Sequence, residues 1–332
     1  MRICCILMPF LVLELLVWVL SISAAPLAYI PNRSNNTVSV FDTATNAVVG
    51  SPIPVGQRPT GVAVSPDGKR VYVTNQLDST VSIINTTTQT ALGSPIQVGD
   101  QPFGVAVHPA GMYVYVANNG SGTVSIIDTQ TQAVLGEPLR VGRAPTGVVV
   151  HPNGAHVYVT NSADDTVSII DTATHTVQAR RIRVGRGPFG IAVHPDGSRL
   201  YVANRIDDTI SVIATATQKT LGQPIPVQNR PFGVAVHPTG DRVYVTNNAS
   251  RSVSVIDTAT RTEIGPPIPV VDAPAGIAVH PDGSQVYVVQ MRDSVAVIDA
   301  QTNLLQDATI QVENVPIALG QFIGPAAVVP NR

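Results

Sequence analysis

Cysteine is missing from all but the beginning of this 332-residue chain, because its two cysteines are Cys4 and Cys5. The remaining residues therefore cannot form a disulfide, present a thiol nucleophile, ligate a metal through sulfur or attach a c-type haem covalently. Charged residues are also few, at 13%, and the formal net charge of −2 gives no overall field that would attract nucleic acid or an anionic membrane. Such a chain must be stabilised by apolar packing, for which its 44% hydrophobic residues provide ample material.

Sequence motifs of common enzymes are missing as well. The chain contains no Cys-x-x-Cys-His haem motif, no glycine-rich phosphate loop, no Gly-x-Ser-x-Gly elbow and no His-Glu-x-x-His zinc motif. We therefore predict no catalytic residue, no metal and no cofactor. Whether the protein is an enzyme stays open at this point, with a non-enzymatic role preferred.

The first 25 residues differ in composition from the rest of the chain. Arg2 precedes an apolar run over residues 3–20, and small residues follow at 21–25. This order of a charged start, an apolar middle and a small-residue end is typical of a secretory signal peptide. An uncleaved membrane anchor is the alternative, because the run is close to bilayer-spanning length, but Glu14 within the run disfavours it. We expect cleavage and a location outside the cytoplasm, in the periplasm, at the cell surface or in the medium.

A Tyr-Val-Thr-Asn motif or a close variant of it returns every 43 residues along the chain. Within one repeat, residues 59–101, four short β-branched runs are separated by turn sequences such as Ser-Pro-Asp-Gly at 65–68. Four strands in about 43 residues are typical of a propeller blade, whereas a parallel β-helix has shorter turns. The runs alternate only partly with polar residues, as expected for sheets covered on both faces. The tyrosines that mark the repeat are Tyr29, Tyr72, Tyr115, Tyr158, Tyr201, Tyr244 and Tyr287.

The two ends of the repeat array predict how the blades close into a ring. The first motif, at Tyr29, has no inner strand before it, while the segment from Pro316 to Phe322 resembles an inner strand with nothing after it. We expect this C-terminal strand to join the three N-terminal strands in a seventh blade, because that pairing removes both free edges. The predicted fold is all-β, a monomeric seven-bladed β-propeller of four-stranded antiparallel blades. Its predicted domains are a signal peptide at 1–25, a single propeller at 26–325 and a C-terminal tail at 326–332.

The repeated motifs resemble a known family. Residues 72–75, 158–161 and 244–247 read Tyr-Val-Thr-Asn, and residues 115–118 and 201–204 read Tyr-Val-Ala-Asn. With the surrounding Pro-x-Gly-Val-Ala-Val-x-Pro-Asp-Gly and Val-Ser-Ile-Ile-Asp-Thr, they resemble the YVTN-repeat β-propeller family over nearly the whole chain after residue 25. The resemblance implies an exported protein of the surface-layer or cell-surface type, and the chain is also distantly similar to lactonase and cytochrome d1-like propellers. A fold of this kind hosts many functions, so the resemblance implies little about activity.

Five histidines follow the same 43-residue interval, and five aspartates recur with it, the last of them one residue early. Each histidine precedes a turn, and each aspartate follows a third strand, where its carboxylate can accept hydrogen bonds from turn N–H groups. A metal ring is the alternative for the histidines, but zinc ligands must lie about 2 Å from one ion. We therefore interpret both sets as structural: His108, His151, His194, His237 and His280, and Asp42, Asp128, Asp171, Asp257 and Asp299.

Candidate ligand residues lie where the loops between second and third strands meet those that precede the inner strands. Asparagines and arginines recur there and give a mixed-charge rim around an axial funnel, which can hold a polar or anionic ligand. An ordinary solvated face is the alternative. We expect specific activity where the repeat is broken, at Asp100, Asp272 and Gln290. The candidate ligand-binding residues are Asn75, Asn118, Asn161, Asn204, Asn247, Arg58, Arg143, Arg186 and Arg230.

Three functions stay open. The preferred one is an exported, non-enzymatic binding or scaffold module whose partner is a polar or anionic ligand, a cell-surface polymer or a protein. The second is a lactonase-like hydrolase that acts on a small cyclic ester at the axial funnel. The third is nucleic-acid or polyanion binding by the arginine rim, which the many aspartates and few aromatic residues disfavour. A closed pocket with Arg, His and Glu would favour hydrolysis, whereas an open ring of Asn and Arg would favour binding.

Overall fold

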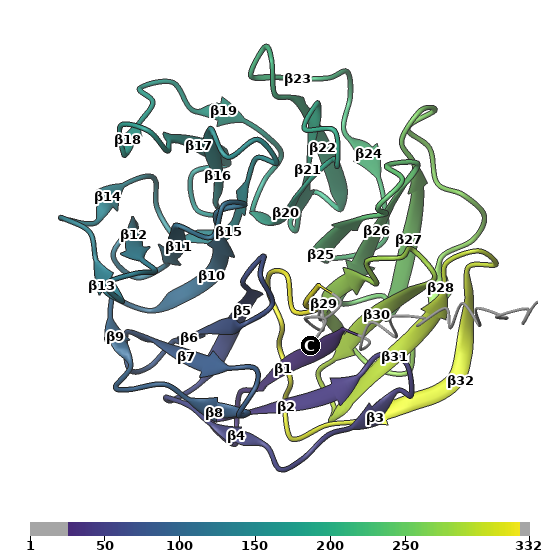
Figure 1. The fold of residues 1–332 in the computed structure, drawn as a ribbon. Helices are drawn as coiled ribbons and strands as arrows, with labels where there is room; N and C mark the ends of the chain where they lie inside the picture. Colours follow the sequence, from purple (N-terminus) through teal and green to yellow (C-terminus); the bar gives the residue numbers. More distant parts are fainter. Residues whose placement is uncertain (1–25, 326–332) are drawn as a thin grey trace, which may run out of the picture.

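The computed structural model describes residues 26–325, and every regular element in this range is a β-strand. The strands form seven small antiparallel sheets of four or five strands each, arranged around a central axis (Figure 1). The predicted seven-bladed β-propeller is thus confirmed. The predicted signal peptide and C-terminal tail lie outside the described residues. Between residues 26 and 325 there is no helix long and apolar enough to cross a bilayer.

Each blade begins at the axis with an inner strand that pairs with the motif strand. A bulge after its first residue frees the N–H of Gly61, which donates to the hydroxyl of Thr74 at 2.8 Å. This hydroxyl in turn donates to the backbone oxygen of Phe103 in the next blade at 2.7 Å, so the motif threonine ties neighbouring inner strands together. The inner strands are β5 (Pro59–Val64), β10 (Pro102–Val107), β15 (Pro145–Val150), β20 (Pro188–Val193), β25 (Pro231–Val236) and β29 (Pro274–Val279). The motif strands are β1 (Leu27–Asn32), β6 (Arg70–Asn75), β11 (Tyr113–Asn118), β16 (His156–Asn161), β21 (Arg199–Asn204), β26 (Arg242–Asn247) and β30 (Gln285–Gln290).

The outer half of each blade is less regular. The third strand pairs with the motif strand along its whole length, but the fourth strand is usually reduced to two-residue segments. A turn such as that at Gly93, where φ is 61°, separates these segments. The third strands are β2 (Thr37–Asp42), β7 (Thr80–Asn85), β12 (Thr123–Asp128), β17 (Thr166–Asp171), β22 (Thr209–Ala214), β27 (Ser252–Asp257) and β31 (Ser294–Asp299). The outermost segments are β3 (Ala47–Val48), β4 (Ile53–Pro54), β8 (Thr90–Ala91), β9 (Ile96–Gln97), β13 (Ala133–Val134), β14 (Leu139–Arg140), β18 (Thr176–Val177), β19 (Ile182–Arg183), β23 (Lys219–Thr220), β24 (Ile225–Pro226), β28 (Ile268–Pro269) and the continuous β32 (Leu304–Gln311).

The ring closes between the two ends of the described chain, as predicted. The N–H of Tyr29 in β1 donates to the oxygen of Phe322 at 2.9 Å, in an antiparallel arrangement. On its other side the same C-terminal segment pairs in parallel with β5, where the N–H of Val62 donates to the oxygen of Leu319 at 3.0 Å. The C-terminal segment is therefore the inner strand of the seventh blade and is bonded to both neighbours. We number the blades in chain order from β5, so that β1–β4 and this segment form blade 7.

Close contact between blades explains the two most regular features of the repeat. All seven motif tyrosines are buried, at 2% exposure or less, and burial raises the pKa of Tyr115 to about 12. The third position is glycine in six of the seven inner strands, because the next blade leaves no room for a side chain, and only the closing strand has Ala318 there. A Cβ atom at Gly61 would lie 2.1 Å from the oxygen of Phe103. The interior therefore combines large side chains within the sheets and bare backbone at the axis.

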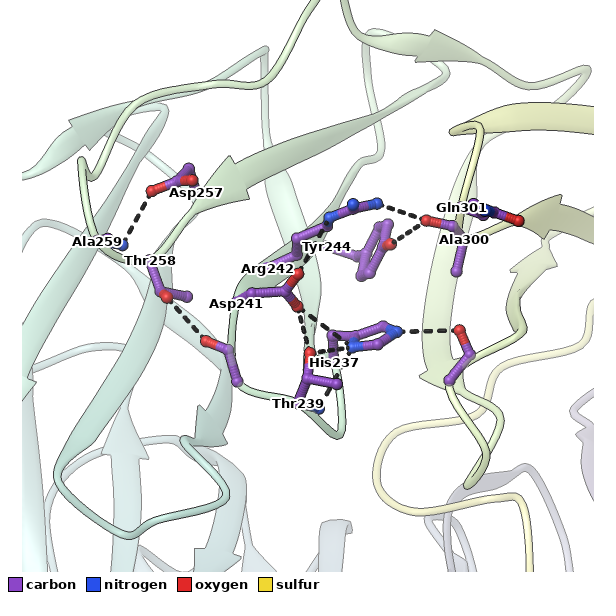
Figure 2. A network of polar contacts seen from close by, with 12 residues as sticks. His237, Thr239, Asp241, Arg242, Tyr244, Asp257, Thr258, Ala259, Ala300 and Gln301 are labelled. Carbon is purple, nitrogen blue, oxygen red and sulfur yellow. Dashed lines mark hydrogen bonds and ion pairs between the residues drawn. The ribbon is translucent and has the colours of Figure 1, made fainter.

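Polar side chains link adjacent blades near the hairpins that join inner and motif strands. In Figure 2, His237 of blade 5 points towards blade 6, and its Nε2 lies 2.9 Å from the oxygen of Gly283. Beside it, Arg242 donates to the oxygen of Ala300 at 2.5 Å (Figure 2). Equivalent contacts occur at His108, His151 and His194, and His280 reaches Thr43 of blade 7 at 3.2 Å. These contacts support the structural interpretation of the periodic histidines.

Candidate functional site

Aromatic rings fill the axis near one end of the propeller. Phe189 and Phe232 lie 4.2 Å apart between ring centroids, and Phe103 meets Phe189 edge-on at 5.5 Å. They form one apolar cluster with Ile317 and Leu319 of the C-terminal strand. We call these five residues the axial plug. Phe103, Phe189, Phe232 and Ile317 occupy the second position of their inner strands, so the plug separates the loop face, where those strands begin, from the hairpin face, where they end.

A cavity of about 610 Å³ lies on the hairpin side of the axial plug. Its walls are Val, Ala, Ile, Gly and Pro residues of the inner strands, with Ser65 and Gln321 as polar side chains. No charged side chain of the described residues contributes to these walls. Catalytic and binding sites normally combine apolar walls with a few convergent polar groups. A cavity on the loop face, described below, does have charged side chains in its walls.

The motif asparagines are buried within the blades. Asn75 is 0% exposed, and its amide nitrogen donates to the hydroxyls of Thr80 and Ser82, both at 2.9 Å. The prediction that these amides line a ligand site is therefore corrected: their N–H groups join the motif strand to the third strand, out of reach of solvent. The same placement holds for Asn118, Asn161, Asn204 and Asn247.

Two of the four predicted arginines form ion pairs on the loop face. Arg143 contacts Asp164 at 2.6 Å and Arg186 contacts Asp207 at 2.5 Å. Both carboxylates also accept the backbone N–H of the arginine, at 2.8 and 2.6 Å, and this backbone bond is the main reason why the pKa of each lies below its ordinary value. The guanidinium groups are well exposed, so these are surface ion pairs that anchor loops.

The other two predicted arginines, Arg58 and Arg230, precede inner strands with positive φ angles of 52° and 55°. The backbone N–H of Arg58 donates to Asn36 Oδ1 at 2.9 Å, and that of Arg230 donates to Asp208 Oδ1 at 2.7 Å. These bonds hold both residues in the left-handed region. Among the described residues, neither guanidinium forms an ion pair.

A cavity of about 470 Å³ opens on the loop face beside Arg230. We call it the Arg205 pocket; it is lined by Ser162, Gly187, Phe189, Arg205, Ile206, Asp208 and Arg230. The guanidinium carbon of Arg205 lies 5.5 Å from the centroid of the Phe189 ring and 5.6 Å from that of Phe232. These are cation–π distances, so the axial plug forms an aromatic floor under this cation.

The charge of Arg205 is not neutralised within the pocket by an ion pair with any described residue. Burial lowers the pKa of Arg205, and the positive charge of Arg230 lowers it further. Its Nε is buried and has no hydrogen-bond partner among the described residues. Two cations that face one cavity over an apolar floor favour an anion between them.

An equivalent arginine pair stands elsewhere on the loop face. Arg33 and Arg58 occupy the repeat positions of Arg205 and Arg230, four repeats earlier in the chain. Burial likewise lowers the pKa of Arg33, and the charge of Arg58 lowers it further. Arg33 Nη2 donates to the amide oxygen of Gln76 at 2.6 Å. We call these two residues the Arg33–Arg58 pair.

The breaks in the repeat that the sequence singled out lie elsewhere. Asp272 is 7% exposed, its N–H donates to Gln290 Oε1 at 2.8 Å, and its Oδ2 lies 3.2 Å from Arg292 Nε. Asp100 is exposed. None of Asp100, Asp272 and Gln290 lines either of the two cavities described above. In the described part of the chain, no three acidic, histidine or cysteine side chains are grouped to hold a metal ion.

Arg205 and Asp208 belong to the mixed-charge rim that the sequence predicts, but neither they nor the phenylalanines were among the candidate ligand-binding residues. A signal for them exists, because the second inner-strand position is Phe in three repeats and Thr, Ala or Ile in the others. Likewise, the position after the motif asparagine is Arg only in two repeats. Such breaks become informative only once the fold shows that these two positions face the axis and the loop-face cavity.

The sequence matches the model of a family described as "Lactonase, 7-bladed beta-propeller" at residues 55–141 and 138–263. These matches span more than half of the chain, and the protein therefore belongs to this family. No curated protein matches the sequence.

Several solved structures share the fold. Hydrazine synthase from Kuenenia stuttgartiensis is 21% identical with a TM-score of 0.71, over 86% of this chain and 92% of that one. A Bacteroides uniformis protein described as a "putative 6-phosphogluconolactonase" is 17% identical with a TM-score of 0.75, over 89% of this chain and 98% of that one. The dihydro-heme d1 dehydrogenase NirN is 17% identical with a TM-score of 0.66, over 87% of this chain and 64% of that one. At these identities the likeness shows the fold alone.

Proposed function

We propose that the protein binds a small anionic cyclic ester in the Arg205 pocket and hydrolyses it to the open hydroxy acid. The observation that carries this proposal is the pair of guanidinium groups, Arg205 and Arg230, that face one cavity over an aromatic floor without a carboxylate ion pair in the described chain. Membership of the lactonase family supports a hydrolase over a purely structural scaffold. Two similar structures carry the description "putative 6-phosphogluconolactonase", which suggests sugar-acid lactones as the first substrates to test.

The pocket supplies complementary surfaces for such a ligand. Arg205 is half-buried, so its hydrogen bonds to a phosphate or carboxylate are less weakened by water than those of an exposed arginine. The exposed side chain of Ile206 and the ring of Phe189 offer apolar contact to the carbon skeleton. A compact ligand with one anionic group and one apolar face therefore fits better than a long polyanion.

The hydrolysis would require a base and an oxyanion partner. Asp208 is the carboxylate that lines the pocket, and within residues 26–325 only its Oδ1 accepts a hydrogen bond, from the N–H of Arg230. Its Oδ2 can accept a proton from a water molecule that adds to the lactone carbonyl carbon. A guanidinium N–H can stabilise the oxyanion that forms, after which the bond from the carbonyl carbon to the ring oxygen breaks and the proton passes to that oxygen.

A second candidate is binding without turnover. No histidine or glutamate of the described residues lines the Arg205 pocket, so the Arg, His and Glu cluster expected for hydrolysis is incomplete. In this case the protein would be an exported binding module, in keeping with the predicted signal peptide and the resemblance to YVTN-repeat proteins. Export and a cell-surface or periplasmic location belong to the proposal under both candidates.

A ring-opening assay tests the proposal. Purified protein is mixed with 6-phosphogluconolactone or with the neutral gluconolactone, and acid release is followed with a pH indicator after subtraction of spontaneous hydrolysis. We expect turnover of the phosphorylated lactone and a fall of about 100-fold in kcat/KM for Arg205→Gln, since the variant removes both anion binding and oxyanion stabilisation. Arg143→Gln, an exposed arginine of the same face, is the matched control and should retain the activity of the unmodified protein.

The same preparation separates the two candidates. Turnover no faster than spontaneous hydrolysis would reject catalysis on these lactones. Calorimetry with 6-phosphogluconate then decides whether the pocket binds. Binding that Arg205→Gln abolishes and Arg143→Gln retains would support the second candidate, and absence of binding would reject the pocket as an anion site.

A further inference from the structure

We propose that the Arg33–Arg58 pair is a second oxyanion site, which binds a carboxylate or phosphate group without turnover. It does not depend on hydrolysis in the Arg205 pocket. The proposal is based on the half-buried guanidinium of Arg33, which lies beside the cation Arg58. Where an ion-pair partner would be expected, the two arginines meet the neutral amides of Gln76 and Asn36.

The geometry of Arg33 provides the first argument. Its Nη2 is held by Gln76 at 2.6 Å, while its Nε is buried without a hydrogen-bond partner among the described residues. An amide oxygen orients a guanidinium but leaves its charge uncompensated. The guanidinium is therefore fixed in direction, and because the residue is partly exposed an oxygen ligand can bind it at a lower entropic cost.

The second argument is that no acid of the described residues forms an ion pair with either arginine. Asn36 stands where the other pair has Asp208, and its Oδ1 accepts the N–H of Arg58 at 2.9 Å. Glu313 approaches from the C-terminal segment, but its carboxylate accepts bonds from Thr37 and Asn32. In the described chain no ion pair includes Arg33 or Arg58.

The difference between Asn36 in this pair and Asp208 in the Arg205 pocket also separates the roles of the two sites. An amide cannot serve as a general base, so this site lacks the group that the Arg205 pocket would use to activate water. Without the negative charge of an aspartate, the Arg33–Arg58 pair should attract an oxyanion more strongly than the Arg205 pocket does. The chemical class of the ligand is a small oxyanion, and the test uses one phosphate and one carboxylate.

Nitrogen-15 NMR of the arginine side chains tests the proposal. The Nε–H groups of Arg33 and Arg205 are both buried, so their cross-peaks should exchange slowly with water and be visible. Each is assigned by its loss in Arg33→Gln or Arg205→Gln. Inorganic phosphate and gluconate are then titrated in separate arms at constant ionic strength, with Arg58→Gln as the variant that tests the pair and Arg186→Gln as the control.

We expect the Arg33 cross-peak to shift along a saturable curve, with affinity about fivefold tighter than at Arg205 because no aspartate opposes the anion. Arg58→Gln should weaken the Arg33 response about tenfold and leave the Arg205 response unchanged. Since Arg58 is exposed, this variant keeps the test valid even if Arg33→Gln does not fold. An Arg33 cross-peak that fails to saturate, or that Arg186→Gln affects as much as Arg58→Gln, would overturn the proposal. A response at Arg33 without one at Arg205 would support this site and count against the Arg205 pocket.

Discussion

The two arginine pairs of the loop face occupy equivalent positions of one repeat and differ in their surroundings. Arg205 lies over the rings of Phe189 and Phe232, whereas the equivalent positions beside Arg33 hold Ile317 and Thr60. The Arg205 pocket contains a carboxylate and the other pair an amide. The repeat thus sets where the cations stand, and residues that break the repeat decide whether a bound anion meets an aromatic floor and a base.

The two pairs also depend on different parts of the chain. The elements around Arg205 come from consecutive blades, whereas the N–H of Arg33 donates to the oxygen of Val315 in the segment that closes the ring, at 3.1 Å. The Arg33–Arg58 pair is therefore built across the closure. A defect in closure should affect it first.

Removal of the closing strand has the largest expected effect. Deletion of residues 316–332 exposes the edges of β1 and β5 and removes Ile317, Phe322 and Ile323, all at 2% exposure or less. Each buried side chain of this size contributes about 2 kcal/mol, and a domain is stable by only about 5–15 kcal/mol. We expect loss of cooperative unfolding, measured by calorimetry. An unchanged melting temperature would contradict the closure by this strand.

Exchange of Asp208 for an amide, and of Asn36 for an acid, is expected to have the next largest effect, on hydrolysis and on anion binding. Asp208→Asn keeps an oxygen for the N–H of Arg230 and a residue type that tolerates the φ of 56° at this position. We expect kcat for lactone hydrolysis to fall about 100-fold, since the base is lost. Phosphate affinity at Arg205 should rise, because a negative charge is removed.

The reverse change, Asn36→Asp, is the counterpart in the Arg33–Arg58 pair. It should weaken phosphate binding there about fivefold and confer no turnover, because the aromatic floor is absent. NMR titration and the ring-opening assay measure both effects. If Asp208→Asn retained full activity, Asp208 would not be the base, although the anion site could still stand.

The sequence predicted the architecture more fully than the site. The 43-residue interval, the turn sequences and the two unmatched ends were sufficient to predict seven blades and their closure. Each of these features can be read from the sequence without knowing any distance between blades. The prediction that the motif asparagines bind a ligand failed for a physical reason. Asparagine at the end of a motif strand has the same identity whether its amide faces solvent or the hydroxyl of the third strand, and the pleat of the strand turns it inwards. Which arginines are left without carboxylates depends on distances between loops of different blades.

The smallest effect on the loop face is expected from a change inside a blade. Asn118→Ala removes hydrogen bonds to Thr123 at 3.0 Å and Ser125 at 2.9 Å, both from a buried amide. The loss should lower the free energy of unfolding by about 2 kcal/mol, measured by urea denaturation. Both phosphate titrations should stay as in the unmodified protein, since Asn118 belongs to blade 2 and lines neither site. A weaker anion response with an unchanged free energy of unfolding would show that the motif asparagines contribute to ligand binding. Residues that keep the repeat could then no longer be treated as structural and those that break it as functional.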